Sequence, residues 1–422
     1  MKRLFMVASV FVMGALALSA ETVMSENSEA AVPEENVKEF NISSAATEMS
    51  MLEEKNALMA APADKEDKDV AYWAQSVLSR VKVLGYAQAG YTATFQENGR
   101  NTNTFDMKRV VMMLGADIAP HFYAFIMHEF KAGNLLEYYM EYRPSKAINF
   151  RLGQSKTEIS MTNPLSPRIF ESINCAPMGI SWLCGSDPLM SNGSGRDMGL
   201  MMYGDLFNNH LRYVIEVVNG GQINKNDQNN QKNIIAKLEY KPVKNFRVSV
   251  SGQKGYGCAV TESAYNDVVR MQKVTEAGIE TLAPVTYHIA KGETYRQDRY
   301  AVGCEWMSSI KGNDYFKNRC TVVRCEAIGG RDGECHSFGA YASLTQPVYK
   351  GMDVVAQVDY FNRNTDMKYK QTDLLLGVQY WMHSKCRVQA QYNYSILSDE
   401  MKAVAGVPGN YGKFMAQVQF SF

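Results

Sequence analysis

The chain has 422 residues, of which 46% are hydrophobic and 21% charged, and its 44 basic residues balance its 44 acidic residues. A neutral chain presents no strongly basic surface, so we expect no nucleic-acid partner. The eight cysteines are too few to form the scaffold of a disulfide-rich protein.

The N-terminus has the layout of a secretory signal. Lys2 and Arg3 precede an apolar run over 4–18, and the small residues Ser19 and Ala20 follow it. We predict a signal peptide over 1–20 that is cleaved after Ala20. The alternative is a membrane anchor, but the run is short and no basic stop follows. Beyond it, no stretch of about 20 apolar residues predicts a transmembrane helix.

The next segment, 21–80, is acidic and polar. It holds 13 acidic and 5 basic residues, a net charge of −8, and one helical candidate at 45–59. This composition predicts a periplasmic tether that is partly disordered or helical. An alternative is an extension that helps to trimerise the protein or contacts the cell wall.

From Val81 onward, side chains alternate between apolar and polar with a period of two, interrupted by turn residues. The pattern predicts an all-β domain over 81–422, a closed antiparallel barrel with an even number of strands. The sixteen expected strands are 81–95, 104–117, 121–130, 134–143, 147–155, 195–204, 209–218, 232–241, 244–254, 298–307, 318–328, 335–344, 351–361, 370–381, 384–395 and 412–422.

The expected connections differ in length by side. Those after even-numbered strands are mostly short, whereas long ones at 156–194, 219–231, 255–297 and 396–411 follow odd-numbered strands. Outer-membrane barrels sort their loops in this way, and a soluble sandwich has no reason to do so. The connection at 308–317 is longer than this rule predicts.

The faces of the strands favour a membrane barrel over a soluble fold. In 232–241, Ile234 and Leu238 alternate with Lys237 and Glu239, and other strands repeat the pattern. Charges that recur on an inner face are costly in a dry core but not beside a water-filled lumen. Several aromatic residues fall near strand ends, where a membrane-interface girdle is expected: Tyr138, Tyr142, Tyr240, Tyr360, Tyr380 and Trp381.

The chain ends in KFMAQVQFSF, with Phe414, Val418, Phe420 and Phe422 on one face and Gln417 and Gln419 on the other. We expect this strand to pair with 81–95 and close the barrel, its apolar face towards outer-membrane lipid. We also expect Phe422 to be the assembly signal that the barrel-assembly machinery recognises.

Four ordered segments carry a family resemblance: NFRLGQSKTEIS from Asn149, GRDMGLMMYGDL from Gly195, YVIEVVNGGQINKND from Tyr213 and KNIIAKLEYKP from Lys232. Together they resemble the phosphate-selective porin O and P family over roughly 80–260. The resemblance implies a homotrimeric, sixteen-stranded outer-membrane channel that often prefers anions. It also implies that the loop after strand 5 folds inward as a constriction loop, and here that loop is 156–194.

The pore-lining candidates are the basic residues of the inner face and of the constriction loop. Acidic inner-face residues accompany them, among them Glu137, Glu141, Glu216, Glu239, Glu305, Glu326, Asp353 and Asp359. The mixed wall predicts passive diffusion of small hydrophilic solutes with a weak preference for anions such as phosphate. The candidates are Arg143, Arg151, Lys156, Arg168, Arg196, Arg212, Lys237, Arg247, Arg299 and Arg324.

The cysteines allow several pairings. Cys175 and Cys184 lie within the constriction loop, where a disulfide would stiffen it. Cys325 could instead meet Cys335 across a hairpin or Cys304 on a neighbouring strand, and free cysteines are the remaining alternative.

We expect no enzyme activity, cofactor or metal site. No G-x-S-x-G or H-E-x-x-H motif occurs, and the Asn-rich loop 224–230 lacks the spaced carboxylates of a calcium site. An adhesive or structural barrel that binds a partner through loop 255–297 is the main alternative to a porin. An outer-membrane enzyme is the lesser one.

Overall fold

The computed structural model describes residues 79–190, 194–276, 279–309 and 319–422. The expected signal peptide and nearly all of the acidic segment, including the helical candidate at 45–59, lie outside these residues. Within them, no helix is long and apolar enough to span a membrane.

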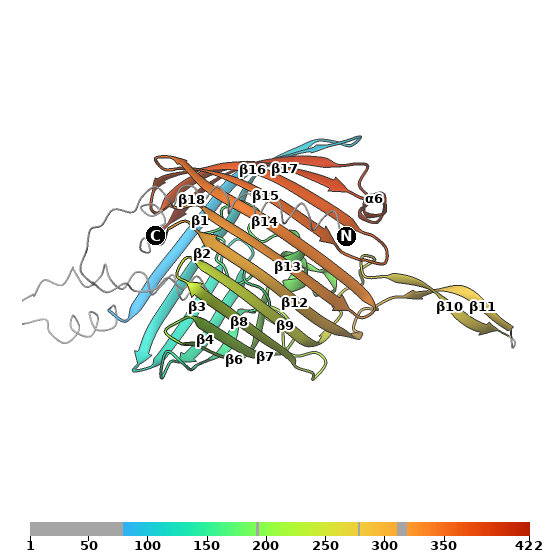
Figure 1. The fold of residues 1–422 in the computed structure, drawn as a ribbon, viewed down its shortest axis with the longest axis horizontal. Helices are drawn as coiled ribbons and strands as arrows, with labels where there is room; N and C mark the ends of the chain where they lie inside the picture. The colour runs from blue at the N-terminus through green and yellow to red at the C-terminus, as the bar shows by residue number, and fades with distance from the viewer. Residues whose placement is uncertain (1–78, 191–193, 277–278, 310–318) are drawn as a thin grey trace, which may run out of the picture. The chain divides into compact units, whose positions relative to one another are not determined.

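Sixteen antiparallel strands close into one barrel, in which β1 pairs with β18 and β9 pairs with β12 (Figure 1). The predicted fold class is confirmed. The strands are β1 (Val81–Gln96), β2 (Thr102–Ala119), β3 (Phe122–Glu129), β4 (Asn134–Tyr142), β5 (Asn149–Lys156), β6 (Arg196–Leu206), β7 (Leu211–Val218), β8 (Asn233–Val243), β9 (Phe246–Cys258), β12 (Thr294–Met307), β13 (Val322–Asp332), β14 (Cys335–Tyr349), β15 (Met352–Asn362), β16 (Lys370–His383), β17 (Cys386–Leu397) and β18 (Tyr411–Ser421).

The expectation that 255–297 is a loop without strands was wrong. It contains a separate two-stranded sheet, β10 (Val268–Glu276) and β11 (Ile279–Tyr287), which extends away from the end of the barrel in Figure 1. Both strands are rich in β-branched residues, which favour extended backbone. A second element missed in the sequence is the helix α6 (Asp399–Ala405), capped by the side chain of Ser398 and by Gly406 in the left-handed conformation.

The connections sort by end as predicted. The end that carries the start of β1 and the finish of β18, here called the turn end, has the short connections 120–121, 143–148, 207–210, 244–245, 350–351 and 384–385. The opposite loop end carries 157–195, 219–232, 259–293, 363–369 and 398–410. The connection 308–321 remains a long exception at the turn end, and 130–133 and 333–334 are short exceptions at the loop end.

The outer face has an aliphatic belt between two aromatic rims. Aromatic side chains near the turn end include Phe122, Tyr142, Tyr240, Tyr349 and Tyr380, and near the loop end Phe95, Phe105, Phe130, Tyr256 and Phe338. This is the distribution expected of a surface in contact with lipid. The belt between them comprises Leu152, Leu200, Ile215, Ile234, Leu238, Val250, Val302, Val358, Leu374, Leu376 and Val378, each 42–64% exposed.

One predicted rim residue points the other way. Trp381 is 6% exposed, and its ring lies 5.1 Å from the guanidinium carbon of Arg387 on the inner face. A register shift between Trp381 and His383 interrupts the regular pairing of β16 with β17. Alternation therefore fails at this strand end.

The closing seam joins β18 over its whole length to residues 86–96 of β1. Gly85 and Phe422 exchange two backbone hydrogen bonds, with N···O distances of 3.1 and 2.9 Å. The Phe422 ring covers Gly85 so closely that a Cβ there would lie 2.2 Å from its Cζ atom. The terminal residue thus needs glycine opposite it.

Candidate functional site: the constriction loop and the inner wall

The connection between β5 and β6 folds into the barrel and includes one turn of α-helix, α5 (Met178–Ser181). A π-helical turn at Trp182–Ser186 and a 3-10 turn at Pro188–Met190 follow. Gly185 adopts a φ of 148°, a conformation open to glycine but rarely to other residues. Most described side chains of the loop are buried, so the loop packs inside the wall.

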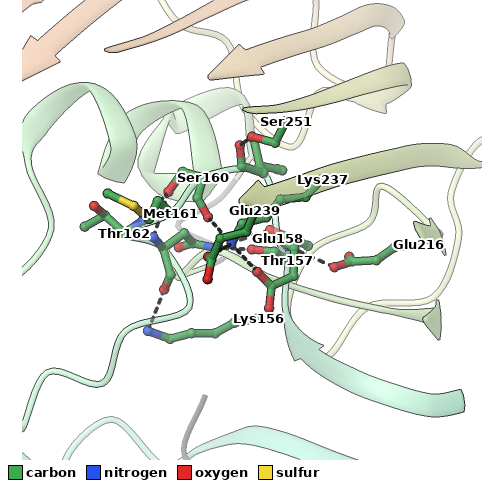
Figure 2. Close-up of polar contacts among 12 residues, drawn as sticks. Lys156, Thr157, Glu158, Ser160, Met161, Thr162, Glu216, Lys237, Glu239 and Ser251 are labelled. Atoms are coloured by element: carbon green, nitrogen blue, oxygen red, sulfur yellow. Dashed lines mark hydrogen bonds and ion pairs between the residues drawn. The ribbon is translucent and has the colours of Figure 1, made fainter. Parts of the chain in front are cut away.

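Charged residues of the wall anchor the first stretch of the loop, 157–163 (Figure 2). Lys237 Nζ donates to Glu158 Oε2 at 2.7 Å, and Glu216 Oε1 accepts from the Glu158 amide at 2.9 Å. Glu326 accepts from the amides of Met161 and Thr162, at 2.7 and 3.2 Å. These carboxylates therefore position the loop backbone.

Neutral side chains anchor the backbone of the second stretch, 166–175, on the opposite part of the wall, while the Glu171 side chain pairs with Arg324 at 3.1 Å. Gln389 and Gln419 donate to the carbonyls of Glu171 and Arg168, at 2.7 and 3.2 Å. Gln391 Oε1 accepts from the Ile173 amide at 2.8 Å. The loop therefore crosses the lumen between a charged and an amide-lined sector.

The third stretch, 178–190, returns to the wall and the loop end. Asp359 accepts from the Met178 amide at 2.7 Å, and Arg299 donates to the Leu183 carbonyl at 2.8 Å. Asp187 Oδ2 accepts from the Asn266 side chain at 3.0 Å. Complete burial raises the pKa of Asp187 to about 7, with the nearby Asp332 carboxylate adding to the rise.

Besides β5 and β6, which it connects, the described part of the loop hydrogen-bonds to strands around the barrel, among them β1, β7, β8, β9, β12, β13, β14, β15, β17 and β18. The inward fold that the family resemblance implied is present. Its contacts reach around the circumference of the barrel, so its path fixes the shape of the lumen.

Eight of the ten predicted pore cations are engaged in ion pairs with carboxylates. Glu141 pairs with Arg143 and Arg151, and Glu305 bridges Arg247 and Arg324 at 2.8 and 2.7 Å. The remaining pairs are Arg196–Glu137 (3.0 Å), Arg212–Asp205 (3.3 Å), Lys237–Glu158 (2.7 Å) and Arg299–Asp332 (2.8 Å).

The other two candidates lie at the loop. Lys156, the last residue of β5, donates to the carbonyls of Asn163 and Leu165, at 2.8 and 2.5 Å. Arg168 lies within the second stretch and accepts at its carbonyl from Gln419. Lys156 and Arg196 are strand residues that face each other across β5 and β6, rather than loop residues.

Sequence reasoning missed an apolar sector of the inner wall. Tyr86 (β1), Met113 (β2), Phe125 (β3) and Tyr139 (β4) belong to one cluster and are 1–4% exposed. The rings of Phe125 and Tyr139 stack with centroids 5.1 Å apart. Both faces of β3 are apolar in the sequence FYAFIMHE, which is a signal that this part of the lumen is not lined by polar groups.

Cys175 and Cys184, one of the possible disulfide pairs, are free thiols in the structure. The two free thiols lie in separate apolar clusters, Cys175 with Leu165 and Phe170, and Cys184 with Ile180 and Leu183. The Cys325–Cys335 alternative is also wrong, because Cys335 lies opposite Asp332 in the register.

The geometry favours the remaining alternative, the pairing of Cys304 with Cys325. Cys304 lies directly opposite Cys325 on β12 and β13, with both thiols free. Their side chains are within hydrogen-bonding reach of each other.

The Asn-rich loop uses its carboxylate internally. Asp227 Oδ1 accepts from the amides of Asn229 and Asn230, at 3.0 and 2.9 Å, and Oδ2 pairs with Lys232. Across the described ranges, no three His, Cys, Asp or Glu side chains are grouped to hold a metal ion.

No protein-family model matches the sequence, and no curated protein matches it either. Solved structures do match, 257 chains among them. The fold resembles that of an anion-selective porin from Comamonas acidovorans, with 11% identity, a TM-score of 0.53 and coverage of 81% of this chain and 99% of that one.

Two further matches have a TM-score of 0.51 and also cover 81% of this chain. One is OmpT of Vibrio cholerae in its trimer form, with 12% identity and all of that chain covered. The other is OmpF of Salmonella typhi, with 11% identity and 97% of that chain covered. The chain has a porin fold. Its membership of the porin O and P family stays a prediction.

Proposed function

We propose that this protein is a passive outer-membrane porin for small hydrophilic solutes. The observation that supports this proposal is the loop, which folds into a closed sixteen-stranded barrel and hydrogen-bonds to strands around its circumference. A loop held inside a barrel narrows the passage and sets the size of solute that crosses. The apolar outer belt with aromatic rims supports a location in the outer membrane of a Gram-negative cell.

We further propose a weak preference for anions, phosphate included. The ion-paired wall argues against strong selectivity, because a cation held beside a carboxylate presents little net charge to a solute. The ion pairs favour an electric field directed across the pore rather than a ladder of unpaired cations along it. The anion-selective porin named above resembles this chain in fold alone.

The proposal includes a signal peptide over 1–20, a periplasmic segment over 21–80 and a homotrimer in lipid. Assembly through the barrel-assembly machinery would use Phe422, which lies at the closing seam against Gly85. Chemical cross-linking of purified protein would test the trimer, and a ladder that stops at the monomer would contradict it.

Single-channel recording in planar lipid bilayers tests the porin proposal. Purified, folded protein should give stepwise conductance in KCl, with a reversal potential in a salt gradient that indicates weak anion preference. Heat-unfolded protein from the same preparation is the control. Absence of steps from folded protein would refute the porin, and a reversal potential of opposite sign would refute only the anion preference.

A second candidate function rests on the hairpin β10–β11. Met271 and Leu282 on this small sheet are 63% and 67% exposed, and isolated two-stranded sheets are marginal in water. An adhesive or structural role through this hairpin would account for such exposure. Deleting 268–287 should then abolish binding to cells or surfaces while conductance persists.

A further inference from the structure

The two ends of the barrel differ in the charge of their connections. Each of the five long connections at the loop end contains at least one Asp or Glu, whereas the six short connections at the turn end contain none. Four of those six turns carry an exposed lysine instead, and these side chains are here called the turn-end lysines: Lys146, Lys244, Lys350 and Lys385.

The turn-end lysines have no carboxylate partner among the described residues. The carboxylates on the adjoining ends of the strands are already paired with other cations: Glu141 with Arg143, Glu239 with Lys241 at 3.4 Å and Asp353 with Arg319 at 3.3 Å. The turn end therefore presents four exposed positive charges without a carboxylate beside them.

The chain itself supplies the opposite charge. Residues 48–69 contain seven acidic and three basic residues, a net charge of −4, and they finish with the run DKEDKD at 64–69. The first barrel strand, β1, begins at Val81 at the turn end. The acidic residues therefore join the barrel at the end that carries the lysines.

The connecting chain is long enough for the two to meet. Asp69 precedes Val81 by twelve residues, and an extended chain of this length spans up to about 40 Å. In the strand order, the turns of Lys385, Lys146 and Lys350 lie two, three and four strands from β1. At about 4.8 Å per strand these turns are about 10 to 19 Å from Val81 along the rim, which is well within reach.

We infer that the acidic residues of 48–69 dock on Lys146, Lys350 and Lys385, so that the chain's own N-terminal segment covers part of the turn end of the barrel. A short tether keeps the two partners at a high effective concentration, which favours contact between opposite charges. Single contacts between exposed charges are weak and are screened by salt, so the docking is reversible. This contact does not depend on whether the barrel conducts.

Zero-length cross-linking of the full chain in detergent tests the contact directly. A carbodiimide joins a carboxylate to an amine only where the two groups touch. We expect links from the acidic residues of 48–69 to the turn-end lysines at low salt, and their loss in about 1 M NaCl, where the screening length falls to about 3 Å. Absence of these links would overturn the inference, and so would equal linkage to three exposed lysines of the loop end, Lys291, Lys368 and Lys370.

A triple variant measures the strength of the docking. Lys146→Gln with Lys350→Gln and Lys385→Gln should speed cleavage within 48–69 by a glutamate-specific protease about fivefold at low salt, the effect of losing three exposed charge contacts. The matched control is the same Lys→Gln change at the three loop-end lysines, which alters the net charge equally and should leave the wild-type rate. Heat-modified mobility checks that both variants keep the folded barrel. Equal rates in the two triple variants would contradict the docking.

Mixtures of isotopically labelled and unlabelled chains identify the partner of the segment. Links within one chain support docking on the segment's own barrel. Links only between labelled and unlabelled chains would assign the segment to a second copy, and protection from the protease only after addition of peptidoglycan fragments would assign it to the cell wall. Either result overturns the inference. These measurements need a folded barrel but no conductance, so their failure leaves the porin proposal standing.

Discussion

Two sectors of the same inner wall are built in opposite ways. On β7–β9, β12 and β13, Arg247, Glu305 and Arg324 form a chain of buried ion pairs. On β1–β4, Tyr86, Phe125 and their neighbours form an apolar cluster. The inside of this barrel is therefore not uniformly wet.

The difference follows from what each sector faces. The charged sector lies under the first stretch of the loop, where Lys237, Glu216 and Glu326 bind the loop's Glu158 carboxylate and backbone amides. The apolar sector packs its aromatic rings against one another. Charges are tolerated inside because each one has a partner, and apolar groups are tolerated because they exclude water together.

The largest effect is expected from breaking the charged chain. Glu305→Gln leaves Arg247 without its closest carboxylate and weakens the hold on Arg324, at a cost of about 4 kcal/mol in the free energy of unfolding. Urea unfolding of the folded barrel in detergent measures it. Glu280→Gln, in the exposed Lys273–Glu280 pair on the hairpin, is the control and should change nothing measurable. Equal effects of the two would contradict the role of burial.

The apolar sector should be the next most sensitive. Phe125→Ala removes a stacked ring from the cluster and should lower the free energy of unfolding by about 3 kcal/mol. The neighbouring Ile126→Ala lies on the outer face at 49% exposure and should cost less. The same urea titration compares them. A larger loss at Ile126 would mean that the inner cluster contributes little to stability.

The charged and the neutral side chains that anchor the constriction loop should differ in strength. Glu326→Ala leaves the Met161 amide without its acceptor and leaves the Thr162 amide only Ser160 Oγ, so it should loosen the first stretch by about 2 kcal/mol. Gln389→Ala removes one neutral bond to the Glu171 carbonyl and should cost about 1 kcal/mol. Hydrogen exchange of the loop amides reports both, and current flicker in bilayers should rise more for Glu326→Ala. The reverse order would overturn the comparison.

The smallest effect on the pore is expected at the closing seam, outside both sectors. Deleting Phe422 removes the ring over Gly85 and two backbone bonds, so assembly into the membrane should fall more than single-channel conductance. Gly85→Val should also lower assembly, because the valine side chain would displace the Phe422 ring. Overpacking of this kind costs about 1 kcal/mol. The yield of folded, heat-modifiable barrel measures assembly. Unchanged yield with altered conductance would refute the assignment.

The sequence by itself determined the barrel, because the period-two alternation of apolar and polar side chains and the lengths of the loops can be read directly from it. It placed the sixteen barrel strands, the long loop after β5 and the inner-face charges such as Glu137 and Arg299, whereas the inward path of that loop came from the family resemblance. The sequence did not reveal the hairpin β10–β11, because these two strands pair with each other in a separate sheet and so lie outside the succession of barrel strands.

Only the tertiary structure decided the partners. Glu305 bridges Arg247 and Arg324 from three different strands, and Glu326 binds a loop 164 residues away in the chain. Such contacts depend on strand register and loop path, which no spacing in the sequence encodes. For the same reason, the distinction between a cation that pairs with a carboxylate and one that is held by backbone carbonyls, such as Lys156, appears only when the wall and the loop are brought together.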